Sequence, residues 1–353
     1  MRVAVVGGGV VGLSTTLALV ERGIDVTCFE PAAPMAKRSA GETRIFRHAH
    51  AYPDMVELAT ESGRLYAGWS ERAGVPLIDV VSTVVSGGPV EAWAAAMAEV
   101  GALHEVVDKQ PEQLRLPAAR IDGPSLVDPA GGAIRVDRIR TFLLDAIGNR
   151  VRRATVESVE ESGGRVRVRF SANDLADSLG TASDAGVDEF DAVVVCAGAG
   201  TAGLTAGLGL AVPDRLEHHV RFSFPVRADM KGPMPCWINS DSYQHLTTAG
   251  TWAVGYDVEA ADVAWELGTE VAERNSRAAV VDYVTRELPG LEPRIVDRLY
   301  CSNNLGLSDG FRFLRSGAVL TAYGENLFKF APLLGEWLAK AAIDGSTPAH
   351  AGP

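Results

Sequence analysis

The first thirty residues contain two apolar runs separated by glycines and an amphipathic stretch: MRVAVVGGGVVGLSTTLALVERGIDVTCFE. This order predicts a strand over residues 1–6, a glycine turn, a helix and a second strand, which together make a βαβ unit. Apolar residues then fall along one face of a helical pattern over residues 54–74. The N-terminal part of the chain therefore predicts an α/β domain.

Strand-like and helix-like patterns alternate through the rest of the chain. Residues 151–170 alternate as a hairpin that turns at Gly163 and Gly164, and the small polar residues of 171–186 predict a mobile surface loop. The apolar run over 190–200 ends in glycines, which is typical of a buried parallel strand that approaches a ligand. The remaining predicted elements are a mainly antiparallel sheet over 216–256, a helix over 270–288, a strand over 318–322 and a closing helix over 333–343.

Composition and charge exclude several classes of partner. The chain has 353 residues, 47% of them hydrophobic, which suits two or three lobes around a cofactor. Its net charge is −12 and it has no long basic cluster, so neither nucleic acid nor an anionic membrane is expected as a partner. An opening strand and the lack of an 18-residue apolar run predict a cytoplasmic protein. The scattered cysteines lack CxxC pairs, so no metal site is expected.

A glycine motif gives the first functional signal. Gly7, Gly9 and Gly12 form GxGxxG between the first strand and the helix, and Glu30 ends the second strand. The glycines allow a tight turn and a close approach to a pyrophosphate at the helix N-terminus, while Glu30 can accept hydrogen bonds from ribose hydroxyls. A glutamate here disfavours a 2′-phosphate, so FAD or NAD fits better than NADP. The motif alone does not separate FAD from NAD.

Five further segments resemble those of one flavoenzyme family. In chain order they are SAGETRIFRHAH at 39–50, DAVVVCAGAG at 191–200, VGYD at 254–257, Cys301 with a following Ser-Asp-Gly, and GENLFKF at 324–330. Their sequences and order are similar to those of monomeric sarcosine oxidase and N-methyltryptophan oxidase, members of the D-amino-acid oxidase superfamily. The resemblance covers nearly the whole chain and is weak between residues 81 and 132.

The resemblance implies a composite α/β fold, with a Rossmann-like FAD-binding domain and an interleaved substrate domain on a mainly antiparallel sheet. The FAD-binding domain is expected over 1–80, 134–210 and 306–345, and the substrate domain over 81–133 and 211–305. The implied activity is oxidation of the carbon–nitrogen bond of a small secondary or cyclic amino acid or related amine. FAD would take the hydride, and its reoxidation by oxygen would give hydrogen peroxide.

Particular residues acquire roles through the resemblance. Cys301 stands where the family forms a covalent thioether to FAD, although by itself an isolated cysteine can equally be a small buried hydrophobe. Arg47 and Lys329 match the pair that holds the substrate carboxylate, and Arg44 matches a cation beside the flavin. Arg44 and Arg47 could also be structural ion-pairing residues, and His48 a packed histidine. Further cofactor contacts are implied for Arg38, Ser39, Thr43, Arg44 and Lys329.

The chain departs from the family pattern around the expected pocket. Ala253 stands nearest to a lysine that assists oxygen reduction, Ala40 replaces a histidine, and Glu325, Asn326 and Leu327 replace a glycine-histidine-glycine sequence. These departures leave two other functions open. One is an oxidase or hydroxylase of a natural-product intermediate, and the other is a flavin-binding protein with little turnover.

Overall fold

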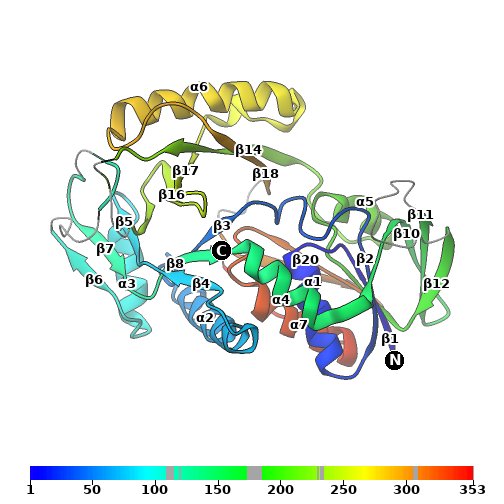
Figure 1. The fold of residues 1–353 in the computed structure, drawn as a ribbon. Coiled ribbons are helices and arrows are strands. Elements are labelled where there is room, and N and C mark those ends of the chain that lie inside the picture. The colour runs from blue at the N-terminus through cyan, green and yellow to red at the C-terminus, as the bar shows by residue number, and fades with distance from the viewer. Residues whose placement is uncertain are drawn as a thin grey trace. The chain divides into compact units, whose positions relative to one another are not determined.

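The computed structural model divides the chain into two compact units, which Figure 1 shows as a ribbon. Unit 1 contains Met1–Ala40, Ile139–Asp214 and Asn304–Pro353, and unit 2 contains Gly41–Arg138 and Arg215–Asn303. The contacts thus group residues 41–80 with unit 2, whereas the sequence analysis assigned them to the FAD-binding set. The structure describes residues 1–108, 115–118, 121–172, 185–228, 230, 234–304 and 309–352. Most of the loop predicted over 171–186 lies outside these residues.

Unit 1 is built on a six-stranded sheet in the order β19-β20-β13-β1-β2-β9. The strands from β20 to β9 run parallel, and β19 is antiparallel at one edge. A separate three-stranded sheet has the order β10-β11-β12. The elements of unit 1 are β1 (Arg2–Val6), α1 (Val10–Glu21), β2 (Asp25–Phe29), α4 (Val136–Ile147), β9 (Val151–Arg152), β10 (Ala154–Ser162), β11 (Arg165–Ala172), β12 (Gly186–Phe190), β13 (Ala192–Val195), α5 (Thr201–Thr205), β19 (Phe311–Ser316), β20 (Val319–Gly324) and α7 (Ala331–Asp344).

The core of unit 1 explains why its strands have no polar face. Val3, Ala4 and Val5 are all buried, as expected of a parallel strand covered on both faces. Helix α7 packs closely against α1 at Gly335. A Cβ on this residue would lie 2.7 Å from the backbone carbonyl of Ser14, so the close approach depends on glycine. The parallel sheet and its close-packed helices hold the glycine turn after β1 in a fixed place.

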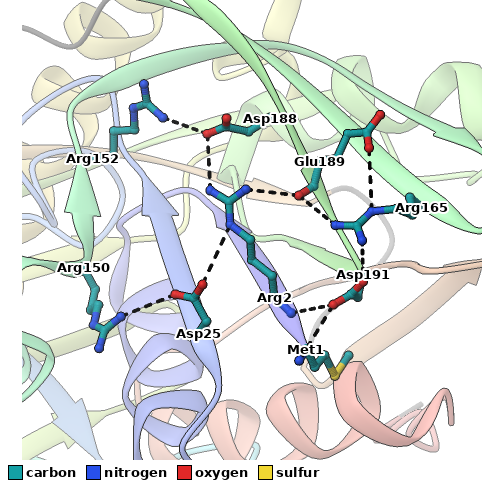
Figure 2. Close-up of polar contacts among 9 residues, drawn as sticks. All are labelled: Met1, Arg2, Asp25, Arg150, Arg152, Arg165, Asp188, Glu189 and Asp191. Carbon is teal, nitrogen blue, oxygen red and sulfur yellow. Dashed lines mark hydrogen bonds and ion pairs between the residues drawn. The ribbon is translucent and has the colours of Figure 1, made fainter.

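Ion pairs tie the small sheet of unit 1 to the start of β1 (Figure 2). The backbone amide of Arg2 donates to Asp191 at 2.6 Å, and the Arg2 guanidinium lies 3.6 Å from Asp188. Arg152 and Arg165 bind Asp188 and Asp191 at 2.8 and 3.2 Å. These groups are partly exposed, so each pair contributes little to stability. They surround the N-terminal end of β1, opposite the glycine turn, and we assign them a structural role.

Unit 2 is built mainly on an eight-stranded sheet in the order β18-β14-β17-β16-β15-β5-β7-β6. The pairs β14–β17, β16–β17, β15–β16, β5–β7 and β6–β7 are antiparallel, and β5–β15 is parallel. A smaller sheet has the order β3-β8-β4. The elements of unit 2 are β3 (Thr43–Phe46), α2 (Pro53–Ala73), β4 (Ile78–Val80), β5 (Thr83–Ser86), α3 (Val90–Glu99), β6 (Glu105–Val107), β7 (Ser125–Asp128), β8 (Gly132–Arg135), β14 (Leu216–Pro225), β15 (Cys236–Ile238), β16 (Ser242–Leu246), β17 (Thr251–Tyr256), α6 (Thr269–Glu287) and β18 (Asp297–Asn304).

Helix α6 covers one face of the β14–β17 region (Figure 1). Phe222, Phe224, Trp252 and Val254 pack with α6 in one hydrophobic core. Because side chains alternate along a strand, the residues between them point to the opposite face. That second face presents polar and small residues, and it forms part of the candidate site below.

The predicted elements are largely confirmed. The helices predicted over 54–74, 270–288 and 333–343 correspond to α2, α6 and α7, and Gly345 ends α7 with a φ of 76°. The parallel strand predicted over 190–200 was too long, because β13 ends at Val195 and a 3-10 turn follows at Gly198–Gly200. The hairpin predicted over 151–170 starts later, since β9 pairs with β2 instead.

Candidate functional site

The glycine turn of unit 1 requires two of its glycines for its own geometry. Gly7 has a φ of 107°, and a Cβ there would lie 2.4 Å from the carbonyl oxygen of Cys196. A Cβ on Gly12 would lie 1.9 Å from the carbonyl oxygen of Gly7. The first turn of α1 can therefore lie against the end of β1 only because these residues lack side chains.

The N-terminus of α1 has the features of a phosphate-binding turn. Gly9 precedes the helix, and a Cβ there would meet only the Ser39 hydroxyl at 3.4 Å. The Val10 amide donates to Ser39 Oγ at 3.0 Å, and the first turn of α1 contains no acidic residue. Open space beside Gly9 and the unneutralised positive helix end fit a pyrophosphate. Gly9 and Ser39, both predicted from the sequence, come together here.

Glu30 is held beside the same turn. Its Oε2 accepts a 2.7 Å hydrogen bond from the Gly8 amide, and its Oε1 accepts one of 2.9 Å from the Ala32 amide. Each carboxylate oxygen keeps a further lone pair that can accept from a hydroxyl group. The turn, the helix N-terminus and this oriented carboxylate together fit the phosphates and ribose of a dinucleotide such as FAD.

The segment at 324–330 contains Glu325, one of the residues that depart from the family pattern, and this residue contacts Arg38. Arg38 forms a 2.7 Å ion pair with Glu325, whose side chain is 12% exposed. Asn326 has a φ of 57°, and its side-chain amide Nδ2 donates to Asp309 Oδ1 at 3.0 Å. Lys329 is buried, and its Nζ lies 5.2 Å from the centre of the Phe330 ring. Glu325 thus gives Arg38 a carboxylate partner within the protein.

In unit 2, Arg44 lies in β3 and Arg47 directly follows it, and the two side chains have different surroundings. Arg44 donates from Nη1 to the Thr43 carbonyl oxygen at 2.9 Å. Arg47 is buried, donates to the Ala49 carbonyl oxygen, and places its guanidinium 4.3 Å from the centre of the Trp93 ring. Lys329 belongs to unit 1, so the joint role of Arg47 and Lys329 stays a prediction.

His48 is packed against Asp128, which agrees with the structural alternative given for this histidine. Its backbone amide donates to Asp128 Oδ2 at 2.6 Å, and its Nδ1 lies 3.2 Å from both carboxylate oxygens. Asp128 is fully buried and also accepts from the Ala130 amide at 3.2 Å. This network joins the segment that follows β3 to β7.

The four cysteines differ in how readily they can form a thiolate. Burial raises the pKa of Cys28 and of Cys196 to about 12, and burial also raises the pKa of Cys236. High thiol pKa values make these three poor nucleophiles. Cys301 lies in β18 and is partly exposed. Attachment of a flavin to Cys301 stays a prediction.

A buried polar cluster in unit 2 was missed by the sequence analysis. Arg221 in β14 donates from Nη1 to the Thr43 carbonyl oxygen at 3.2 Å and contacts His245 Nε2 in β16 at 3.2 Å. Nearby, the Tyr243 hydroxyl lies 2.8 Å from His219 Nε2. The alternation in LEHHVRFSFP, which puts an arginine between the buried Val220 and Phe222, is the signal that could have revealed it.

The cluster is electrostatically unusual because it is buried. Burial lowers the pKa of His245, and the positive charges of Arg221 and Arg44 lower it further against a smaller opposing effect of the Thr43 backbone, which favours the neutral ring. Burial raises the pKa of Tyr243, with a further rise from Cys301 and an opposing effect of Arg221 and Arg44. Strongly shifted groups gathered on one sheet face are typical of functional sites.

Small residues make room for this cluster. Ala253 in β17 is fully buried and pairs with both Ser223 and His245. A Cβ on Gly255 would lie 2.2 Å from a ring carbon of Tyr243, so only glycine leaves space for the tyrosine. Ala253 and Gly255 therefore shape the face that Arg221 and His245 occupy.

The glycine turn, the oriented Glu30 and the parallel sheet define a dinucleotide-binding oxidoreductase fold. A model of the FAD dependent oxidoreductase family (DAO) matches residues 2–341, and the chain belongs to this family. This match confirms the family resemblance and the composite α/β fold that the sequence predicted. Its members depend on FAD, which settles the choice that the glycine motif left open between FAD and NAD.

Several solved structures share the fold over nearly the whole chain. NikD, described as an unusual amino acid oxidase essential for nikkomycin biosynthesis, is 21% identical with a TM-score of 0.82, covering 98% of this chain and 95% of that chain. L-proline dehydrogenase from P. horikoshii is 15% identical with a TM-score of 0.76, covering 98% and 93%. Glycine oxidase from Geobacillus kaustophilus is 15% identical with a TM-score of 0.71, covering 99% and 96%. No curated protein matches the chain in sequence.

In the part of the chain that the structure describes, no three His, Cys, Asp or Glu side chains are grouped so that they could hold a metal ion. Within those same residues, no helix has both the length and the apolar character that crossing a membrane requires.

Proposed function

We propose that this protein oxidises the carbon–nitrogen bond of a small secondary or cyclic amino acid or a related amine. The observation that carries the proposal is the family match over residues 2–341 together with the intact turn of Gly7, Gly9 and Gly12. FAD, when bound, would accept a hydride at its N5 atom and pass the electrons to oxygen, giving hydrogen peroxide. Solved structures of similar fold described as glycine oxidase and L-proline dehydrogenase support an amino-acid substrate.

We assign the two tasks to different units. Unit 1 would hold FAD through the glycine turn, Ser39 and Glu30, because these residues present amide donors, a positive helix end and a carboxylate. Unit 2 would supply the substrate-facing residues, because its antiparallel sheet carries a buried polar face. This division follows the interleaved domains predicted from the sequence, with residues 41–80 moved to the substrate side.

The residues predicted for substrate binding retain the required charge. Arg47 and Lys329 would bind the substrate carboxylate, with the guanidinium giving orientation and the ammonium adding charge. Arg44, together with Thr43 and Arg38, would lie along the cofactor. Arg38 now pairs with Glu325, and Arg47 donates to the Ala49 carbonyl oxygen. To serve these roles, each arginine must bind the ligand in addition to its present partner or in place of it.

Covalent attachment through Cys301 is the finer part of the proposal. Its support is the position of Cys301 in the family-like order of motifs and its partial exposure, in contrast to the raised pKa values of Cys28, Cys196 and Cys236. All four cysteines are free, which also supports a reducing compartment such as the cytoplasm.

A second candidate function is oxidation of a natural-product intermediate. NikD, with a TM-score of 0.82, is described as essential for nikkomycin biosynthesis, and this chain has replaced several pocket residues of the sarcosine oxidase pattern. As an oxidase, this candidate shares the chemistry of the first and differs in the substrate; as a hydroxylase, it would differ in both.

One preparation tests the proposal. The purified protein should be yellow, and it should release hydrogen peroxide with at least one member of a panel of glycine, N-methyl amino acids, proline and pipecolate. A protein that stays colourless after incubation with FAD and binds NAD instead would rule out the flavin assignment. A yellow protein that is inactive on the whole panel but active on larger decorated amino acids would favour the second candidate.

A further inference from the structure

Arg221 is a buried cation whose surroundings do not neutralise it. Its side chain is 5% exposed, and among the described residues no carboxylate forms an ion pair with it. Its Nη1 is used by the Thr43 carbonyl oxygen and by His245, while its Nε has no hydrogen-bond partner in that part of the chain. Buried charges in proteins are normally paired. Among the described residues, Arg221 has no anionic partner.

His245 adds a second buried donor. Arginine is always a donor, so the 3.2 Å contact makes His245 Nε2 the acceptor and places the ring proton on Nδ1. His245 is fully buried, and its Nδ1 has no hydrogen-bond partner among the described residues. The hydroxyl of Thr43, the residue whose carbonyl oxygen contacts Arg221, also has no partner there. Native proteins rarely leave such groups unsatisfied unless a ligand, water or ion completes them.

The charges around the cluster favour an anion. Arg44 is a second positive charge that acts on His245 and Tyr243. The negative groups that act on Arg221 are Tyr243, Cys301, Asp297 and Glu42, and the first two are neutral in their protonated forms. Glu42 is engaged by the Thr248 hydroxyl and the Ala249 amide, and Asp297 is exposed. None of these residues supplies the missing acceptor.

We propose that Arg221, His245 and Thr43 form a binding site for a carboxylate, and that the carboxylate is carried by the substrate. Arginine Nε and its neighbouring nitrogens present N–H donors in a planar arrangement that matches two carboxylate oxygens. His245 Nδ1 and the Thr43 hydroxyl supply further donors. The assignment to the substrate rests on the proposed function. The site would bind a second acid group of the substrate, in addition to the carboxylate assigned to Arg47 and Lys329.

FAD is the other source of an anionic oxygen in this enzyme class. Its pyrimidine carbonyl oxygens accept hydrogen bonds and gain negative charge when the flavin is reduced. Binding of a small carboxylate and binding of sulfite distinguish the two sources, because sulfite adds to the flavin ring and its adduct is stabilised by a cation near the pyrimidine.

The first measurement uses sodium acetate as the probe. Thermal unfolding of the purified full chain is followed in increasing acetate, with sodium chloride at equal ionic strength as reference. Acetate should raise Tm in a saturable manner, as a ligand of the folded state does. In Arg221→Gln the acetate concentration for half the effect should rise about tenfold or more, because a charged donor is replaced by a neutral one. Arg227→Gln, which removes an exposed arginine that bonds the Leu291 carbonyl oxygen, should behave as wild type.

Two further variants separate ligand binding from a structural role. Arg221→Lys keeps the charge but not the planar donors, and His245→Asn keeps a donor of smaller size. Both should weaken the acetate effect severalfold while the Tm in chloride stays within a few degrees of wild type. Equal acetate effects in wild type, Arg221→Gln and His245→Asn would overturn the proposal.

The sulfite titration completes the test. If Arg221→Gln weakens the sulfite adduct and flavin retention, and acetate has no effect on wild type, then Arg221 binds the flavin and the substrate assignment is wrong. The acetate measurement needs no flavin, so it stands even if the protein proves to bind none. Failure of the flavin assignment and failure of this site are thus distinguishable.

Discussion

A Cβ atom on Gly12 would lie 1.9 Å from the carbonyl oxygen of Gly7. This is far inside van der Waals contact, so the two backbones can meet only while residue 12 has no side chain. Gly9, in the same motif, differs because a Cβ there would meet only Ser39 Oγ at 3.4 Å. One glycine is required by the fold, and the other leaves space for a ligand.

Substitution of these two glycines should therefore separate folding from cofactor binding. Gly12→Ala forces α1 away from β1, and we expect a loss of about 1–3 kcal/mol in the free energy of unfolding together with loss of FAD. Gly9→Val should leave the Tm of the FAD-free protein nearly unchanged but abolish FAD binding, since its side chain would occupy the pyrophosphate space. Thermal unfolding and flavin absorbance measure the two effects. Equal loss of Tm in both variants would contradict this distinction.

The sequence predicted local features better than those that depend on strand pairing. The βαβ unit was predictable because Gly7, Gly9, Gly12 and the flanking apolar runs are adjacent in the chain, and each has a local physical reason. The Arg221–His245 contact was not, because β14 and β16 meet only through β17, whose register no local pattern specifies. The partner of Arg38 was missed for the same reason, since Glu325 comes from a distant segment.

Covalent attachment can be tested by acid precipitation. Flavin should remain with the denatured wild-type protein and appear in the supernatant for Cys301→Ala, because Cys301 is the residue proposed to form the thioether. Cys196→Ala is the matched control, since Cys196 is also partly exposed but its pKa is raised to about 12 by burial. Yellow colour wholly in the wild-type supernatant would exclude the covalent link while leaving FAD binding intact.

Arg47→Ala and Lys329→Ala should each raise KM for a substrate that has a carboxylate. Loss of one partner of a desolvated charged contact costs about 2–5 kcal/mol, which is on the order of a hundredfold or more in affinity. Arg47→Ala should also lower Tm, because its guanidinium packs on Trp93 and bonds the Ala49 carbonyl oxygen. Steady-state kinetics with an amino acid and with the amine that lacks its carboxylate give the comparison. Equal losses on both substrates would assign the two residues a structural role.

The neutral state of His245 predicts a pH dependence of stability. Burial and the charges of Arg221 and Arg44 lower its pKa in the folded state, whereas the unfolded value is about 6.5. Below the unfolded pKa the unfolded chain binds a proton that the folded protein does not, so stability is present above about pH 6.5 and falls as the pH is lowered. One such group contributes a slope of at most about 1.4 kcal/mol per pH unit. Urea unfolding between neutral and acidic pH should show a smaller slope in His245→Gln, and an unchanged slope would mean that His245 titrates normally.

Ala253 predicts slow reaction of the reduced flavin with oxygen. Electron transfer from reduced flavin to oxygen creates a transient superoxide anion, and a fixed cation beside the flavin lowers that barrier by electrostatic stabilisation. Ala253 supplies no charge, and it is fully buried between Ser223 and His245. We therefore expect slow reoxidation of the reduced wild-type enzyme by air and an increase of about tenfold or more in Ala253→Lys, measured by stopped-flow mixing with oxygenated buffer.

Ala253→Met is the matched control for that experiment, because it adds similar volume without charge and should not speed reoxidation. The nearby Arg221 and Arg44 should lower the pKa of the introduced lysine, so its effect should diminish as the pH rises. Wild-type reoxidation as fast as that of ordinary amine oxidases would show that another cation already serves this role. In that case Arg44→Met and Arg221→Gln identify which one, because only the residue that faces the reacting oxygen should slow the reaction when its charge is removed.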